Sequence, residues 1–198
     1  MTMPKLTYYY TPTTCSLASH VALEESGLPF EASRVRLHDP EAVEIWRRTN
    51  PAGGVPALMC DERLLTENVA ILHHVAHLAP HAQLLPDDGF DQASALSLTA
   101  WFASTVHITG RMARAPFRFT PDQTTHEALS AEGRRRFEAN LRKVDGLLTG
   151  RDWLVGDRLS VADAYALVFY AWGVAGDYPM AELKHFSALA RRMAERPG

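Results

Sequence analysis

Residues 8–29 are YYYTPTTCSLASHVALEESGLP, and this stretch decides the fold. Its aromatic start favours a short strand, which the turn signal Thr11-Pro12 ends. Small and apolar side chains then recur on one helical face over Ser16–Ser26, and a glycine and a proline follow closely. A glycine just past a helix, with a proline soon after it, is typical of a helix end. The stretch therefore predicts a strand that leads directly into a helix.

The next segments continue this alternation of strands and helices. The expected strands are Leu6–Tyr10, Phe30–Leu37, Val55–Met59 and Arg63–Leu65, and the expected helices are Ser16–Ser26, Ala42–Arg48 and Asn68–Leu78. Alternation of this kind is typical of an α/β unit. We therefore predict an α/β domain over residues 1–81.

The rest of the chain has a different pattern. Residues 82–90, AQLLPDDGF, contain a proline and an Asp-Asp-Gly turn and are expected to form a linker. Beyond them helical spacing prevails, which predicts an all-helical domain over residues 91–198. Ser160–Asp163 has the pattern of a capping box, and Arg196-Pro197-Gly198 is expected to end the last helix. One helix is expected to direct a largely apolar stripe to the core: Leu98, Trp101, Thr105, Ile108 and Met112.

Composition excludes several classes of protein. The chain has 198 residues, of which 46% are apolar and 22% charged, and its formal net charge is −3. A general nucleic-acid binder or a protein of anionic membranes would be more basic. Every apolar run is shorter than the roughly 20 residues of a membrane span. Two cysteines and no visible secretory signal favour a reducing, cytoplasmic location.

Cys15 is the strongest candidate for chemistry, because it lies between the first predicted strand and helix. Unpaired N–H groups and the helix dipole at that position favour a thiolate. No second cysteine stands at C-x-x-C spacing, so an internal disulfide cycle is excluded. The thiol would then suit mixed disulfides or hold another thiol close; the alternative is a small buried apolar residue. Cys60 has acidic neighbours and is interpreted as inert.

Two loops have features of a ligand site. Val55-Pro56 follows a Gly-Gly pair, and a cis bond there would turn the Val55 backbone outward to pair with an extended ligand. Thr66-Glu67-Asn68 precedes a helix, whose N-terminus binds carboxylates, while Glu67 can hold an ammonium group. The two together would bind a zwitterion; an ordinary helix cap is the alternative.

His107 belongs to a small and polar face of the long helix, opposite the expected apolar stripe. This face would suit the wall of a cleft, although a solvated face gives the same pattern; its other members are Ala100, Ala103, Ser104 and Arg111. Tyr10 is the strand tyrosine nearest the Cys15 loop. The histidines at 73, 77 and 81 are two i,i+4 pairs, but no further ligand completes a metal site, so no metal is expected.

Four motifs together resemble the cytosolic glutathione transferases, most closely the bacterial beta class. They are YYYTPTTCSLASHVALEESGLPFE (8–31), NPAGGVPALM (50–59), LLTENVAILHHVAHL (64–78) and WLVGDRLSVADAYA (153–166). The resemblance covers nearly the whole chain, in order and at compatible spacing. It implies a thioredoxin-like N-terminal domain that binds glutathione, an all-helical C-terminal domain and a homodimer.

The resemblance also implies roles for individual residues. Cys15 matches the cysteine beside the glutathione sulfur, and His107 matches a helix histidine that reaches the thiol region. The remaining matches concern binding: Val55 before a cis Pro56 for the cysteinyl part, Glu67 and Asn68 for the γ-glutamyl end, and His38 as the nearest substitute for a lysine. A small hydrophobic electrophile would lie in a cleft that faces Ala103, Ser104, His107 and Arg111.

The resemblance is incomplete at two positions, where Ala100 replaces a frequent asparagine and Ile108 a usual lysine. The expected function is a glutathione transferase-like enzyme that joins glutathione to an electrophile in detoxification. One alternative is a glutathione-dependent thiol–disulfide reductase or isomerase. Another, which Ala100 and Ile108 favour, is a non-catalytic interaction protein that keeps the fold.

Overall fold

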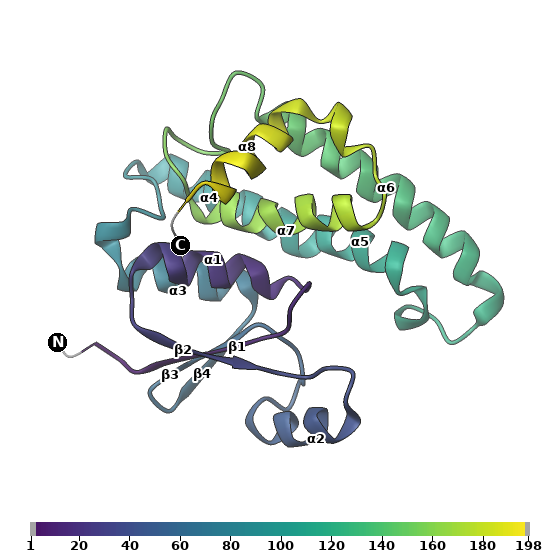
Figure 1. Cartoon of the computed structure of the whole chain (residues 1–198), viewed down its shortest axis with the longest axis horizontal. Helices are drawn as coiled ribbons and strands as arrows, with labels where there is room; N and C mark the ends of the chain where they lie inside the picture. Colours follow the sequence, from purple (N-terminus) through teal and green to yellow (C-terminus); the bar gives the residue numbers. More distant parts are fainter. Residues whose placement is uncertain (1–2, 197–198) are drawn as a thin grey trace.

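The computed structural model describes residues 3–196 and consists of a small α/β domain beneath a larger helical domain (Figure 1). The four strands of the sheet are β1 (Leu6–Tyr10), β2 (Phe30–Arg34), β3 (Ala57–Cys60) and β4 (Arg63–Thr66). Their order is β2-β1-β3-β4; β1 runs parallel to β2 and antiparallel to β3, and β3 is antiparallel to β4. The parallel pair β1–β2 needs a crossover, which the first helix supplies.

Helices cover both faces of this sheet: α1 (Ser16–Ser26) and α3 (Asn68–Leu78) on one, and α2 (Pro40–Thr49) on the other (Figure 1). Alternation along β1 explains why. Tyr8 is fully buried beneath α1, whereas its neighbour Tyr9 packs on the other face against Trp46 of α2, with ring centroids 4.6 Å apart. Gly27 ends α1 in the left-handed conformation (φ 66°), as the sequence predicts.

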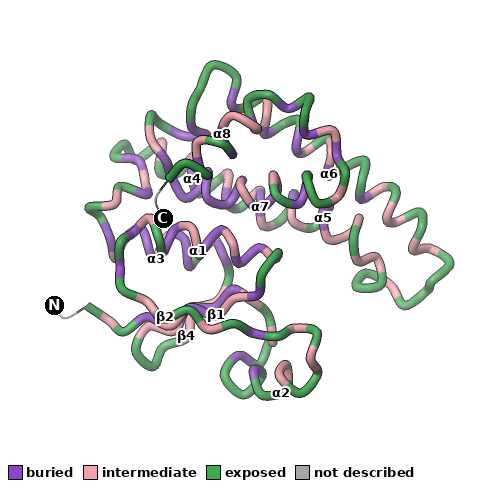
Figure 2. The backbone as a smooth tube through the Cα atoms, in the orientation of Figure 1, coloured by how far each residue is buried: buried purple, intermediate pink, exposed green. Residues whose placement is uncertain are grey.

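The C-terminal domain contains five helices among the residues that the structure describes: α4 (Gly89–Trp101), α5 (His107–Arg114), α6 (His126–Leu147), α7 (Val161–Ala175) and α8 (Lys184–Ala194). Figure 2 shows that the most continuous burial follows α7, which packs against α1 of the other domain. The prediction of a thioredoxin-like domain followed by a helical one is therefore confirmed.

The predicted capping box at the start of α7 is confirmed. Asp163 accepts hydrogen bonds from the Ser160 backbone N–H at 2.9 Å and from the Leu154 N–H at 2.8 Å, and Ser160 accepts one from Ala162. Burial raises the pKa of the Asp163 carboxyl to about 6, against the opposite effect of these hydrogen bonds. The buried carboxyl thus joins the 153–160 loop to the helix.

The apolar stripe predicted for the long helix is present only in its first half: Leu98 and Trp101 pack against the core, but the stripe does not continue to Ile108. Ile108 is exposed and Trp101 only half-buried, with the Lys143 ammonium over its outer face; the buried residues are Ala95, Thr99, Phe102, Val106, Thr109 and Gly110. Residues 102–106 form a π-helical turn between α4 and α5. Such a turn shifts the phase of the side chains, so 3.6-residue spacing cannot be extended across it.

Helices α5 and α6 make a very close approach at Gly133. A Cβ at this position would lie 2.5 Å from the Ala113 backbone nitrogen and 2.8 Å from the Met112 carbonyl carbon. Only glycine therefore allows this spacing. At about 100° per residue, Arg111 lies roughly 160° and His107 roughly 120° around α5 from Ala113, so both side chains point away from this contact.

Several boundaries differ from the sequence prediction. β2 ends at Arg34 rather than Leu37, although Val35 still donates to the Tyr10 carbonyl at 2.8 Å. The third strand begins at Ala57, because Val55-Pro56 belongs to the preceding loop. The predicted stop at Pro197-Gly198 lies outside the described residues, and the domain limits at 81, 82–90 and 91 stay predictions. Among residues 3–196, no helix combines the length and apolarity needed to cross a bilayer.

Candidate functional site

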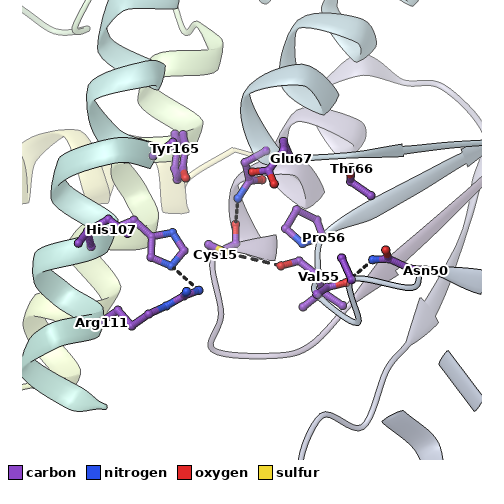
Figure 3. A pocket seen from close by; sticks show the side chains of 14 residues that line it. Cys15, Asn50, Val55, Pro56, Thr66, Glu67, His107, Arg111 and Tyr165 are labelled. Carbon is purple, nitrogen blue, oxygen red and sulfur yellow. Dashed lines mark hydrogen bonds between the residues drawn. The ribbon is translucent and has the colours of Figure 1, made fainter. Parts of the chain in front are cut away.

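Two adjoining cavities lie where the sheet domain meets α5 and α7. The first cavity, of about 290 Å³, is lined from the N-terminal domain by Cys15, Val55 and Glu67 and from the helical domain by His107 and Tyr165 (Figure 3). The second cavity, of about 600 Å³, shares Cys15, Val55, His107 and Arg111 with the first and extends toward α2 and the end of α5. Residues far apart in the sequence thus form one continuous cleft.

Cys15 lies immediately before α1, with its sulfur directed into this cleft (Figure 3). The Sγ donates a hydrogen bond to the Val55 carbonyl at 3.7 Å. The first N–H groups of α1 have partners of their own, since Ser16 N–H donates to Thr14 Oγ1 and Leu17 N–H to the Thr14 carbonyl. These two N–H groups are therefore not directed at the sulfur, and the Cys15 backbone N–H is the helix-terminal donor that lowers the pKa of its thiol.

The prediction of a thiolate at Cys15 is wrong for the free protein. The residue is 8% exposed, and burial raises the pKa of its thiol to about 11. The Arg111 guanidinium lowers this pKa, but by less than burial raises it. Cys15 is a neutral hydrogen-bond donor at physiological pH. Burial also raises the pKa of Cys60, followed by the effect of Asp61, in agreement with the interpretation of that residue as inert.

The loop before β3 presents the Val55 backbone to the cleft. The Val55-Pro56 bond is cis, as the sequence suggests. The neighbouring Gly54 carbonyl accepts hydrogen bonds from Trp46 Nε1 at 3.1 Å and from Asn50 Nδ2 at 2.9 Å. These two bonds fix the loop to the end of α2, so the Val55 carbonyl stays beside Cys15.

The start of α3 forms the opposite end of the first cavity. Glu67 is exposed and adopts φ 71°, a conformation that a non-glycine residue rarely takes and that is frequent at functional sites. No side chain caps the helix there, so the first N–H groups of α3 face the cavity without a side-chain acceptor. The buried Asn68 amide is already engaged: its Oδ1 accepts from Ser19 Oγ at 2.5 Å and its Nδ2 donates to the Cys15 carbonyl at 2.8 Å.

His107 and Arg111 form the helical wall of the cleft. Arg111 Nη2 lies 3.3 Å from His107 Nε2, and because a guanidinium only donates, Nε2 is the acceptor. Burial, followed by the charges of Arg111 and Arg114, lowers the pKa of His107 to about 4. The imidazole is therefore neutral at physiological pH. Its ring packs edge-on against Trp172, with centroids 5.2 Å apart.

Three of the candidate residues do not line either cavity. Tyr10 stacks on Tyr8 within the sheet domain, with ring centroids 6.2 Å apart. His38 is exposed in the loop before α2, and Ser104 is exposed on the π-helical turn. Ala100 is also exposed and outside the lining. The structure therefore gathers Cys15, Val55, Pro56, Glu67, Asn68, His107 and Arg111, with Ala103 beside them.

Tyr165 is a cavity residue that the sequence analysis missed. It is 1% exposed on α7, and burial raises the pKa of its hydroxyl. Tyr165 lies in the apolar stretch of α7 that follows the capping box, where a tyrosine usually packs in the hydrophobic core. Only the packing of α7 on α1 shows that its ring edge reaches the cleft.

The histidines of α3 do not form a metal site within residues 3–196, where no group of three potential ligands lies close enough together. His77 Nδ1 instead lies 2.6 Å from the His73 carbonyl, an ordinary contact within one helix.

Comparison with known proteins matches both halves of the chain. Residues 4–77 match the family model for the glutathione S-transferase N-terminal domain, and residues 107–197 match the model for the C-terminal domain. Over 193 residues the chain is 35% identical to glutathione S-transferase GstA of Escherichia coli O157:H7, which covers 96% of this chain and 92% of that protein.

Solved structures agree with this match. A glutathione transferase homologue from Sulfitobacter with bound glutathione has a TM-score of 0.89 and 30% identity, over 98% of this chain and 95% of that one. The bacterial beta-class glutathione S-transferase of Sphingomonas chungbukensis has a TM-score of 0.85 and 29% identity, over 96% and 94%. Two family models, a relative of nearly full length and two structures share this arrangement, and the chain belongs to the glutathione S-transferase family.

Proposed function

We propose that this protein joins the thiol of glutathione to a small hydrophobic electrophile, with the first cavity as the glutathione site. The observation that carries the proposal is the contact between Cys15 Sγ and the Val55 carbonyl, in the cavity that also holds the start of α3. The Val55 backbone, the Cys15 sulfur and the N-terminus of α3 thus line one cavity, in which an extended γ-glutamyl-cysteinyl peptide would contact all three.

The γ-glutamyl end of glutathione lies at α3 in this proposal. Glu67 is exposed and pairs with the ligand ammonium, while the uncapped N–H groups of α3 bind its carboxylate. Asn68 contributes its backbone N–H, because both ends of its side chain hold Ser19 and Cys15. The cysteinyl part pairs with the Val55 backbone, so its sulfur comes to lie between Cys15 and His107.

The reaction is a nucleophilic displacement or addition. The glutathione thiol releases its proton to solvent, and its sulfur attacks the electrophilic carbon. In a displacement the leaving group departs with the bonding electrons, and in an addition the adduct takes up a proton from solvent. The Arg111 guanidinium favours the thiolate by its charge, and the neutral Cys15 S–H turns from the Val55 carbonyl to donate to the bound thiolate. His107 is neutral and positions Arg111 through the contact at Nε2.

Calorimetry with glutathione, followed by absorbance assays with 1-chloro-2,4-dinitrobenzene, tests this proposal. Glu67→Gln should raise the KM for glutathione about tenfold, because it removes a charge-assisted hydrogen bond. Glu62→Gln is the matched control, since Glu62 is exposed on the β3–β4 turn and does not line the cavity. Absence of glutathione binding to the unmodified protein would contradict the proposal.

The reductase alternative depends on Cys15 as a nucleophile, which its raised pKa opposes. Incubation with oxidised glutathione and measurement of the intact mass separates the two. Conjugation without an adduct at Cys15, and its partial retention in Cys15→Ser, would support the transferase. An adduct at Cys15 with loss of all turnover in Cys15→Ser would instead support the reductase. Glutathione binding with no turnover of any electrophile or disulfide would favour the interaction protein.

We also propose a homodimer in the cytoplasm that uses no metal. Phe90 and Leu96 of α4 are 79% and 46% exposed, and a second copy that covers them would remove this apolar surface from water. Size-exclusion chromatography with light scattering measures the mass in solution, and a monomer at micromolar concentration would contradict the dimer.

A further inference from the structure

The charged side chains described in the lining of the second cavity are all positive. Four arginines line it: Arg47 from α2, Arg111 and Arg114 from α5, and Arg118 from the turn after α5. Among the described residues, no aspartate or glutamate belongs to its lining. The whole protein has a net charge of −3, so this concentration of positive charge is local and opposite to the average.

Three of these four charges have no acidic partner. Within residues 3–196, no carboxylate lies within 4.0 Å of Arg111, Arg114 or Arg118, whereas Arg47 lies 3.8 Å from exposed Glu44. The neighbouring helix α6 differs, because its Arg135, Arg136 and Arg142 all pair with glutamates. The charge of the cavity is therefore available to a ligand.

Two of the guanidinium groups, those of Arg114 and Arg111, are also held in place. That of Arg114 lies 3.7 Å from the centre of the Trp172 ring, and its Nε donates to the Gly110 carbonyl at 3.3 Å. Arg111 is fixed by His107 (Figure 3). Burial lowers the pKa of Arg114, and Arg111 lowers it further, because two like charges share the wall. An anion in the cavity would remove this repulsion.

We propose that the second cavity selects electrophiles that carry a carboxylate, which Arg114 and Arg118 bind while the reacting carbon faces the sulfur near Cys15. The inference rests on the proposed function, and it names the substrate class of the same site. Planar guanidinium groups pair with carboxylates through two parallel hydrogen bonds, so they give both charge and orientation. The volume of about 600 Å³ suits an aromatic or alkenoic acid.

A pair of matched substrates tests the inference. In 4-chloro-3-nitrobenzoate the glutathione sulfur forms a bond to the carbon that bears chlorine, chloride leaves with the bonding electrons, and the thiol proton goes to solvent. The neutral 4-chloro-3-nitrobenzamide reacts at the same carbon with the same leaving group. For each compound, kcat/KM is divided by the second-order rate constant of its uncatalysed reaction with glutathione. This ratio corrects for the different intrinsic reactivity of the two rings.

We expect the corrected kcat/KM for the acid to exceed that for the amide by about tenfold or more at low ionic strength. Added salt should reduce this ratio. Arg118→Gln and Arg114→Gln should each lower the ratio about tenfold. Arg151→Gln is the control, since this exposed arginine lies outside both cavities, and its ratio should equal that of the unmodified protein. A ratio near one in the unmodified protein would overturn the inference.

A binding measurement keeps the test independent of turnover and of folding defects in the variants. The glutathione thioethers of the two compounds, one with a carboxylate and one with a carboxamide, are compared by calorimetry on the unmodified protein. Tighter binding of the carboxylate supports the inference, and equal binding overturns it. If glutathione itself binds but the two thioethers do not differ, the proposed function stands and the inference fails. If neither thioether nor glutathione binds, both fail.

The carboxylate of the glutathione glycyl residue is the competing occupant of these arginines. In that case Arg114→Gln and Arg118→Gln would raise the KM for glutathione equally with both electrophiles, and the acid-to-amide ratio would not change. That result would also overturn the inference.

Discussion

Trp172 Nε1 donates a hydrogen bond of 3.1 Å to the Thr13 carbonyl, and this bond joins α7 to the loop that carries Cys15. Thr13 adopts φ 64°, in the left-handed region that costs energy for a non-glycine residue. The helical domain therefore holds the loop of the other domain in a strained conformation, and the position of the sulfur depends on both.

Replacement of Trp172 by phenylalanine should loosen this loop. We expect Trp172→Phe to lower the free energy of unfolding by about 1–2 kcal/mol and to speed alkylation of Cys15, because the hydrogen bond to Thr13 is lost. Urea unfolding and iodoacetamide labelling measure the two effects. Trp101→Phe is the control, since Trp101 lines neither cavity and has no hydrogen bond to the Cys15 loop. Equal labelling rates in the two variants would show that the bond does not shield the sulfur.

The reactivity of Cys15 should increase with pH far into the alkaline range. With a pKa of about 11, only about one thiol in a thousand is ionised at pH 8. In a Cys60→Ser background, the logarithm of the alkylation rate should rise with a slope of one per pH unit through pH 10. A plateau below pH 9 would mean that the helix terminus outweighs burial after all.

His107 should make the protein acid-sensitive. The unfolded pKa is about 6.5 and the folded pKa is about 4, so between these values the unfolded chain binds the proton more readily. Stability is therefore complete above pH 6.5 and is lost as the pH falls, by about 2 kcal/mol at pH 5. His107→Gln should remove this share of the pH dependence in urea unfolding, and His81→Gln, an exposed histidine, should not.

The buried carboxyl of Asp163 should be essential for stability. Asp163→Ala leaves the Leu154 and Ser160 N–H groups without acceptors, and we expect a loss of about 2–4 kcal/mol. Asp157→Ala removes an exposed carboxyl from the adjacent loop and should cost less than about 0.5 kcal/mol. Similar midpoints for the two variants in chemical unfolding would contradict the role given to the capping box.

Local signals in the sequence predicted much of this fold. Gly27 and Ser160–Asp163 fix helix ends through bonds within a few residues, and both features are present. The predicted apolar stripe does not continue from Trp101 to Ile108, because the spacing of apolar residues does not show the π-helical turn between α4 and α5. Sequence periodicity locates a helix, but the orientation of a helix depends on its neighbours.

The sequence predicted which loop residues line the candidate site, but it did not predict their protonation states. Val55 and Glu67 were found because turn residues and helix starts are visible in sequence. The neutral state of Cys15 was not, since it follows from burial beneath the helical domain. Tyr165 was missed for the same reason: only the contact of α7 with α1 brings it to the cleft.

The close approach at Gly133 has a consequence for selectivity. Because α6 touches the backbone of α5 there, one added methyl group would displace α5 away from α6, toward the side on which His107 and Arg111 lie. The width of the substrate entrance is thus set in part by a residue that no substrate ever meets. Divergence among proteins of this shape can therefore begin at a position behind the reactive surface, and a comparison limited to the residues around the ligand would overlook it.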